Sequence, residues 1–341
     1  MTLQILWFVL WGVLWAAYFM LDGFDLGAGM LYGILGRNDA ERAAIRRTLG
    51  PVWDGNEVWL ITAGGATFAA FPAVYASMFS FLYLALLLVL FALIFRGVAL
   101  EFRAKGQGPA WAKTWDISLM IASLALTLLL GVAFGNIFRG LPFDAQGYHG
   151  TFLSLLNPYG LLTGLLFVAL FSVQGALWIG LKTEGELGRR AVKTAGALWY
   201  ALAILAVAFL AASYFATDLA ANYLRHPVWL IVPVLAVAGL AAVKIWAGRE
   251  KANLAFAASS ATVVLTTFTG IVGLFPNLIP SRSDPVSSLT AFNSSSSPTT
   301  LTVMTVAALV FVPVVIAYQV WVYRVFRHKT VVGEKPDSLD Y

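Results

Sequence analysis

Four carboxylates near the start of the sequence are the side chains best placed to do chemistry. Asp22 and Asp25 lie in LDGFDLGAG, and Asp54 and Glu57 lie in GPVWDGNEVWLITAGG, where the next apolar run begins. An ionisable group at membrane depth is costly, so it marks an ion or proton path or a buried charged partner. Because the whole chain has only 17 Asp and Glu, this concentration does not indicate an ordinary solvated surface.

The elements that must position these acids are membrane helices. The chain has 341 residues, 60% of them hydrophobic and 11% charged, whereas soluble domains are roughly 25% charged. This composition predicts an all-α integral membrane protein with one polytopic domain over residues 1–341. Since the sequence has no cysteine, disulfides, thiolate-ligated haem and iron–sulfur clusters are excluded.

Nine apolar runs are each long enough to cross a bilayer, since a spanning helix needs about 20 residues. We expect two four-helix groups and one extra helix. The runs lie at about 3–35, 51–73, 76–96, 115–138, 157–181, 195–215, 228–248, 254–275 and 300–326.

The basic residues predict the orientation of these runs. All but three of the 22 Lys and Arg fall after the first, third, fifth and seventh runs or in the C-terminal tail, which includes Lys335. Only Arg139, Arg225 and Arg282 lie on the other side. Because cytoplasmic connections are enriched in Lys and Arg, the N-terminus is predicted outside and the C-terminus in the cytoplasm. The net charge of +5 therefore indicates topology and no nucleic-acid partner.

The connection between the last two runs is long and polar. It reads PNLIPSRSDPVSSLTAFNSSSSPTT. Its composition is typical of a flexible linker, and its length is equally typical of an ordered loop that covers a partner or a cavity.

The predicted orientation brings several polar residues to a similar depth. The first span runs inward, so Asp25 lies about 15 Å from its cytoplasmic end, while Asp54 lies within about one turn of the start of the second span and Glu57 one turn deeper. The third span returns inward and ends at Arg96. We therefore expect Asp54, Glu57, Arg96 and Asp25 to form one cluster in the cytoplasmic half, with Asp22 in a structural role.

Two interpretations of this cluster remain open. In the first, the cluster is a proton conduit or the charged wall beside one. In the second, it is a structural pairing in which Arg96 neutralises carboxylates and holds three helices together. Small residues support close packing nearby: Gly23 and Gly27 form a small-xxx-small face, and Gly64 and Gly65 are expected to do the same for the second span.

The remaining polar residues predict no redox centre in this chain. His149 and His226 fall in outer connections and His328 in the tail, so a bis-histidine haem site within the membrane is excluded. Gln174 and Gln319 are expected to form hydrogen bonds between helices. The sequence has no phosphate-binding, dinucleotide or metal-ligand motif. No catalytic residue and no metal site are therefore predicted.

Five blocks of the sequence resemble subunit II of cytochrome bd-type ubiquinol oxidases. Their order and spacing match over nearly the whole chain, with the weakest stretch at about 185–250. The blocks are GFDLGAGML, GPVWDGNEVWLITAGGATFAAFPAVYA, FRGVALEFR, LKTEGEL and PNLIPSRSDPVSSLTAFNSSSSPTTLTVM.

The resemblance implies an electrogenic terminal oxidase of the bacterial inner membrane, active in aerobic or microaerobic respiration. Such an oxidase oxidises a quinol at the outer face and reduces dioxygen to water with cytoplasmic protons. It implies that subunit I holds two haems of b type and one of d type, and that this multi-pass chain is a scaffold that ligates no haem. Some relatives also hold a quinone in subunit II, and small single-helix subunits are a further implied partner.

The resemblance also implies roles for individual residues. Family proposals place a cytoplasmic proton entrance at the subunit interface, and the matching residue here is Asp54. Asp25 and Arg96 match further polar positions, whereas Glu57 is matched less firmly because some relatives carry Gln there.

Two other functions fit the same residues. A proton-coupled secondary transporter also uses intramembrane carboxylates and helices interrupted by Gly or Pro. A pure assembly partner would use the acids only for structural ion pairs.

Overall fold

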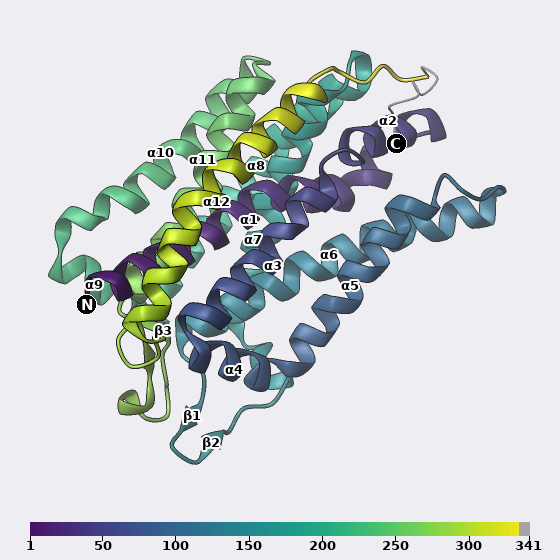
Figure 1. The fold of residues 1–341 in the computed structure, drawn as a ribbon. Coiled ribbons are helices and arrows are strands. Elements are labelled where there is room, and N and C mark those ends of the chain that lie inside the picture. The colour runs from purple at the N-terminus through teal and green to yellow at the C-terminus, as the bar shows by residue number, and fades with distance from the viewer. Residues whose placement is uncertain (334–341) are drawn as a thin grey trace.

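The computed structural model describes residues 1–333, and these fold into twelve α-helices with two short β-hairpins (Figure 1). Lys335 lies outside the described residues. The helices are α1 (Thr2–Leu35), α2 (Asp39–Leu49), α3 (Trp53–Ala70), α4 (Pro72–Phe81), α5 (Tyr83–Phe102), α6 (Pro109–Arg139), α7 (Pro158–Lys182), α8 (Gly185–Ala216), α9 (Leu219–Arg225), α10 (Ile231–Gly248), α11 (Ala252–Leu274) and α12 (Pro298–Val325). The hairpins pair β1 (Phe143–Asp144) with β2 (Gly147–Tyr148) and β3 (Asn277–Ile279) with β4 (Leu289–Thr290), both antiparallel.

Eight helices in the described part of the chain are long and apolar enough to cross a membrane: α1, α5, α6, α7, α8, α10 with the 3₁₀ turn that precedes it, α11 and α12. The chain is thus an all-helical, multi-pass membrane protein. α3 occupies the second predicted run but is not one of the eight. Its 18 residues include Asp54, Asn56 and Glu57 in the first turns, and these lower its hydropathy.

The predicted second and third runs fold as three helices. α3 ends at Ala70. The next residue, Phe71, has a φ of −136° and a ψ of 66°, which are not helical, and Pro72 begins α4. The residue before a proline is disfavoured in the α region, which accounts for the break at Phe71. α5 then runs to Phe102, so the predicted third span at 76–96 was placed too early.

Two helices begin well before their predicted spans. α6 begins at Pro109 and α8 at Gly185, against predicted starts at 115 and 195. The added turns carry polar side chains that find partners at the helix ends, such as Arg190, which donates to Leu35 O at 2.6 Å. Hydropathy indicates the part of a helix that lies within the bilayer and not the full length of the helix.

α1 and α7 pack backbone to backbone, as the Gly23–Gly27 pair predicted. A Cβ on Gly27 would lie 1.8 Å from Phe171 O, and one on Gly175 would lie 2.2 Å from Ala28 N. Only glycine allows this approach. Because lipid is as apolar as the helix side chains, little hydrophobic driving force holds helices together in a membrane, and the dispersion contacts of this close packing stabilise the pair instead. α7 is accordingly the most enclosed span, with 83% of its apolar window buried.

Aromatic side chains fill the space between α1, α6 and α7. The Phe134 ring lies edge-on to Trp15 and Phe19, with centroids 4.9 and 5.1 Å apart, and Phe167 packs edge-on to Phe19 at 5.0 Å. Such pairs contribute about 0.5–1.5 kcal/mol each beyond their buried area. This core holds the inner part of α1 rigid.

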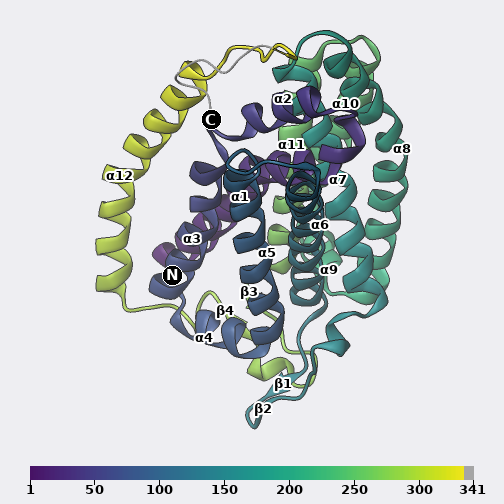
Figure 2. The same ribbon diagram turned by 90° about the vertical axis from the view of Figure 1, so that its right-hand side faces the viewer.

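Ion pairs tie together one end of the bundle, which we call the basic end. It contains α2 and the connections α5–α6, α7–α8 and α10–α11, and the hairpins lie at the opposite end (Figure 2). Asp116 of α6 accepts from Arg103 Nε at 2.7 Å and from Arg42 Nη1 of α2 at 3.1 Å. Glu41 of α2 pairs with Arg190 of α8 at 2.7 Å.

The long connection before α12 is ordered, which decides between the two structures expected for it. Leu278 and Ile279 of β3 are fully buried. Ser296 Oγ donates to Ala69 O at 2.6 Å, and Gln4 Nε2 donates to Phe292 O at 3.2 Å. The connection is therefore a folded cover over the ends of α1 and α3.

α12 stands apart from the other long helices. Figure 2 shows it at the edge of the molecule, beside α3 and away from α8. Only 6% of its apolar window is buried. It packs mainly against α1 and α3, and its Tyr323 ring lies edge-on to Trp178 of α7. An exposed span of this kind faces lipid or another membrane protein.

Candidate functional site

Arg96 of α5 joins three helices through two carboxylates. Its Nη2 lies 3.1 Å from Asp22 Oδ1 of α1, and its Nη1 donates to Glu57 Oε1 of α3. The Arg96 and Asp22 side chains are at most 1% exposed, and Glu57 is 19% exposed. An isolated buried charge costs several kcal/mol, so these three groups stabilise one another. We call them the Arg96 triad.

A second polar arm connects α1 and α3 to α12. Asn56 Nδ2 donates to Asp25 Oδ2 at 2.6 Å. Asn56 Oδ1 in turn accepts from Gln319 Nε2 at 3.1 Å and from Tyr323 OH at 2.9 Å. Asp25 and Asn56 are fully buried. The amide of Asn56 therefore holds the Asp25 carboxylate and docks α12, and we call this set the Asn56 arm.

The two arms together carry more negative than positive formal charge. Asp22, Asp25 and Glu57 face one cation, Arg96, which interacts electrostatically with all three carboxylates. In a low-dielectric interior, unbalanced carboxylates are strongly disfavoured. A group of this composition is suited to hold or pass a proton.

Asp54 lies outside both arms. It is exposed in the first turn of α3, and it makes no ion pair or side-chain hydrogen bond with any of residues 1–333. The same helix face continues with Val58, Ile61 and Phe68, which are 50%, 74% and 60% exposed. We call residues 54, 58, 61, 65 and 68 the outward face of α3.

The structure thus separates the four predicted site residues into groups. Glu57 and Arg96 are in direct contact, Asp25 lies in the Asn56 arm, and Asp54 faces outward. Asp22 pairs with Arg96 in the triad, and the structural role expected for it stays a prediction.

Sequence reasoning missed Asn56 and Tyr323 as site residues. Asn56 lies between Asp54 and Glu57 in a block that was interpreted only through its two acids. Its place between them could have identified it as a site residue. Tyr323 lies in the last apolar run, where one hydroxyl among exposed aliphatic residues gives no signal. Gln319 and Gln174 do make the predicted hydrogen bonds between helices: Gln174 Nε2 donates to Met20 O at 2.9 Å.

The expectation for Gly64 and Gly65 is wrong within this chain. A Cβ on either residue would meet no described atom within 4 Å. Both lie on or beside the outward face of α3, so the bare backbone there is open to a helix from outside the chain.

The histidines lie where the sequence placed them, outside the long helices. His149 follows β2, His226 ends α9, and His328 follows α12. Among residues 1–333, no group of three His, Cys, Asp or Glu is arranged to hold a metal ion.

Fold and site together define the class: an all-helical, multi-pass membrane protein with a charged cluster inside it and a carboxylate on an uncovered helix face. The family model for cytochrome bd terminal oxidase subunit II matches residues 3–326. The chain belongs to this family.

Individual relatives support the assignment. The chain is 38% identical to cytochrome bd-I ubiquinol oxidase subunit 2 of Escherichia coli K12, over 94% of this chain and 93% of the relative. It is also 38% identical to cytochrome bd ubiquinol oxidase subunit 2 of Bacillus subtilis, over 96% and 97%. A chain in the structure of bd oxidase from Geobacillus thermodenitrificans shares the fold, with a TM-score of 0.78 and 19% identity over 96% of this chain and 99% of that one.

Proposed function

We propose that this chain is the scaffold subunit of a quinol-oxidising, dioxygen-reducing bd oxidase in a bacterial inner membrane, and that it contributes to proton delivery. Membership of the subunit II family supports the oxidase assignment. The observation that carries the mechanistic part is Asp54 on the outward face of α3, among residues suited to a membrane-embedded contact.

In the proposed topology α3 is a ninth span, with the N-terminus outside and the basic end in the cytoplasm. One group would contain α1, α3, α5 and α6, a second α7, α8, α10 and α11, and α12 would be the extra helix. Helices within each group pack against one another, and α7 joins the two groups through its contacts with α1 and α6. The clustering of Lys and Arg at the basic end supports the orientation.

We assign the haems, two of b type and one of d type, to the partner subunit I. A haem axial ligand is commonly His, Cys, Met or Tyr. This chain has no Cys, and its three His lie outside the long helices. In the complex this chain would position subunit I. A quinone in this chain and small single-helix subunits stay predictions.

The outward face of α3 is the proposed docking surface for subunit I. A carboxylate that faces hydrocarbon is strongly disfavoured, so Asp54 calls for a polar partner or water in the assembled membrane. Gly65 on the same face would let a partner helix approach closely. α12 beside it offers a second uncovered span.

Proton delivery would then begin at Asp54 on the subunit boundary. The Arg96 triad and the Asn56 arm lie behind it within this chain, where three carboxylates share one guanidinium. In this account Glu57 is the link between the outward face and the buried groups, because its side chain is 19% exposed and contacts Arg96. Asp25 and Arg96 would hold the charge balance of the route.

An Asp54→Asn variant of the whole complex tests this role. We expect it to assemble and retain its haem absorbance while quinol-dependent oxygen consumption falls by about 10²-fold, the usual size of a lost proton-transfer group. Glu101→Gln is the control, since Glu101 is a carboxylate at the same end of the bundle that pairs with Lys105. Its turnover should stay within about twofold of the unmodified complex.

Two results would reject the proton-delivery role. Unchanged oxygen consumption in Asp54→Asn would show that the carboxylate is dispensable. Loss of haem or of assembly would favour the purely structural interpretation.

A proton-coupled transporter fitted the sequence, but family membership favours the oxidase.

A further inference from the structure

α8 and α10 are in contact near the basic end and are separated by a gap nearer the hairpin end. Trp199 Nε1 of α8 donates to Leu240 O of α10 at 2.7 Å, and Lys244 Nζ of α10 donates to Gly196 O at 3.0 Å. Beyond these contacts, a cavity of about 490 Å³ lies between the two helices and α9. The gap is therefore closed at the basic end.

This larger cavity opens sideways, towards the surroundings of the bundle. Among its lining residues, Leu210 and Tyr214 of α8 are 41% and 61% exposed. Val234 and Val237 of α10 are 62% and 54% exposed. Because both helices are long and apolar enough to span the membrane, the opening faces the hydrocarbon of the bilayer.

The lining of the larger cavity is suited to an apolar ligand. Its side chains are aliphatic or aromatic apart from two hydroxyl residues, and these are already bonded within the chain. Ser213 Oγ donates to Phe209 O at 2.7 Å, and Thr269 Oγ1 donates to Leu265 O at 2.8 Å. Tyr223 OH donates to Thr269 O at 2.7 Å. None of the residues that line this cavity is charged, so it selects hydrocarbon and not a headgroup.

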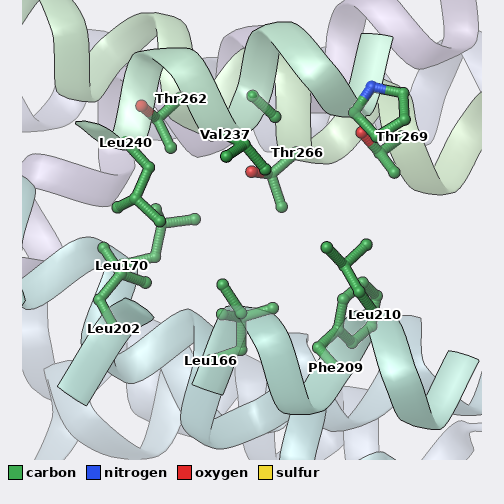
Figure 3. Close-up of a pocket in the computed structure, with 13 residues that line it drawn as sticks. Leu166, Leu170, Leu202, Phe209, Leu210, Val237, Leu240, Thr262, Thr266 and Thr269 are labelled. Carbon is green, nitrogen blue, oxygen red and sulfur yellow. The ribbon is translucent and has the colours of Figure 1, made fainter. Parts of the chain in front are cut away.

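The gap narrows towards the interior of the bundle. A second cavity, of about 50 Å³, adjoins the first along the same gap. Its inner wall is formed by Leu166 and Leu170 of α7, which are 2% and 4% exposed. Figure 3 shows Leu166 and Phe209 facing Val237 across this space. The residues that line both cavities are Phe209, Leu210, Pro233, Val237 and Thr269.

The gap is as deep as one leaflet of a bilayer. Leu230 lines the larger cavity and Leu240 lines the narrow one. These residues are ten positions apart, which is about 15 Å along a helix. Half of a hydrocarbon core of about 30 Å is also about 15 Å. A chain that enters at the hairpin end and stops at the closed end therefore has the length of one leaflet's hydrocarbon.

We propose that one acyl chain of a phospholipid, from the leaflet at the hairpin end, occupies this gap. The chain enters between Leu210 and Val234 and its end lies against Leu166, while the headgroup stays at the membrane boundary near Leu230. The narrowing of the gap fits an unbranched chain better than a branched isoprenoid chain. A filled gap supplies dispersion contacts that a void would lack. The chain thereby stabilises α10, which packs mainly against α11.

Photocrosslinking in a bilayer tests the proposal. The intact complex is placed in nanodiscs that contain phosphatidylglycerol with a diazirine at the end of one acyl chain, and the labelled residues are identified by mass spectrometry. We expect labelling of Leu166 and Leu170, which lipid around the bundle does not reach because both are buried. Ala206 lines the narrow cavity, so Ala206→Phe should remove this labelling. Ala201→Phe is the matched control, because Ala201 is exposed on the same helix and lines neither cavity.

Further probes separate the chain from other occupants. Phosphatidylglycerol with the diazirine on its headgroup should label residues near Leu230 and not Leu166. Labelling confined to exposed residues such as Ile204, or labelling of Leu166 that persists in Ala206→Phe, would overturn the proposal. So would a ubiquinone with a diazirine at the end of its tail that labels Leu166 more strongly than the phospholipid does. If Ala206→Phe fails to assemble, the labelling pattern of the unmodified complex still decides.

Discussion

At the residue scale, Arg96 is the side chain on which the buried charges depend. It contacts Asp22 on one helix and Glu57 on another. The sequence predicted that Arg96 would meet carboxylates, because the depth of each residue follows from orientation and helical rise. It could not predict which carboxylates, since that depends on the rotation of each helix about its axis.

We expect Arg96→Gln to destabilise the complex severely. Breaking a buried ion pair by removing one partner costs about 3–5 kcal/mol, because the other charge stays buried and unpaired. The yield of assembled complex and its thermal unfolding midpoint measure the effect. Adding Asp22→Asn should restore part of the loss. If Arg96→Gln alone assembles with an unchanged midpoint, the triad has no structural role.

Glu41 gives a pH-dependent prediction outside the membrane spans. Burial raises the pKa of Glu41, whereas the hydrogen bonds from Arg190 and from the Arg37 backbone N–H lower it. The lowering is the larger effect, so the pKa of Glu41 lies below its ordinary value. A lowered pKa means that the ionised group adds stability above the unfolded-state pKa of about 4.3, and that this stability is lost as the pH falls through the lower, folded-state pKa.

The Glu41→Gln variant should therefore be less stable than the unmodified complex by about 1.5–3 kcal/mol between pH 6 and 8, the range for a hydrogen bond to a charged group. The difference should shrink as the pH falls below about 4. Thermal unfolding at several pH values measures it. A difference that stays constant down to acid pH would assign the loss to packing and not to charge.

At the element scale, hydropathy and charge predicted most of the helices but not their ends. α1, α7, α11 and α12 match their predicted runs within two residues. The second predicted run, 51–73, ends close to the break at Phe71–Pro72, but the apolar character that continues from α3 into α4 does not show where the next span begins. Hydropathy does not detect a change in backbone direction, although the proline was a usable signal.

The glycines of α1 and α3 should respond to substitution in opposite ways. Gly27→Val would place side-chain atoms in the α7 backbone, since even a Cβ would lie 1.8 Å from Phe171 O. We expect this variant to prevent folding of the chain, seen as loss of the protein from the membrane fraction. A Cβ on Gly65 would meet no described atom within 4 Å, so we expect the Gly65→Leu chain to persist in the membrane.

Gly65→Leu should instead weaken the assembly with subunit I, seen as haem-bearing subunit I that no longer co-purifies with this chain. Gly196→Leu is the control on a helix away from α3, because a Cβ at Gly196 also meets no atom within 4 Å. Should Gly65→Leu co-purify as well as Gly196→Leu does, the outward face of α3 is not an interface.

At the scale of the whole molecule, the chain has two sides with different surroundings. α3 and α12 present uncovered apolar surface with one carboxylate, Asp54, whereas α8 and α10 present exposed aliphatic side chains. In the proposed complex the first side meets subunit I and the second meets lipid. The family resemblance in the sequence predicted a partner for Asp54.

The most direct measurement is the accessibility of the outward face in the assembled complex. The chain has no native cysteine, so Ile61→Cys and, on α8, Ile204→Cys each introduce a single thiol in this subunit, at positions 74% and 70% exposed. A membrane-soluble maleimide is applied to each complex in its bilayer. Our account predicts that the thiol of Ile61→Cys is protected until subunit I is dissociated, while the thiol of Ile204→Cys reacts at once. Equal labelling of both thiols in the intact complex would contradict it.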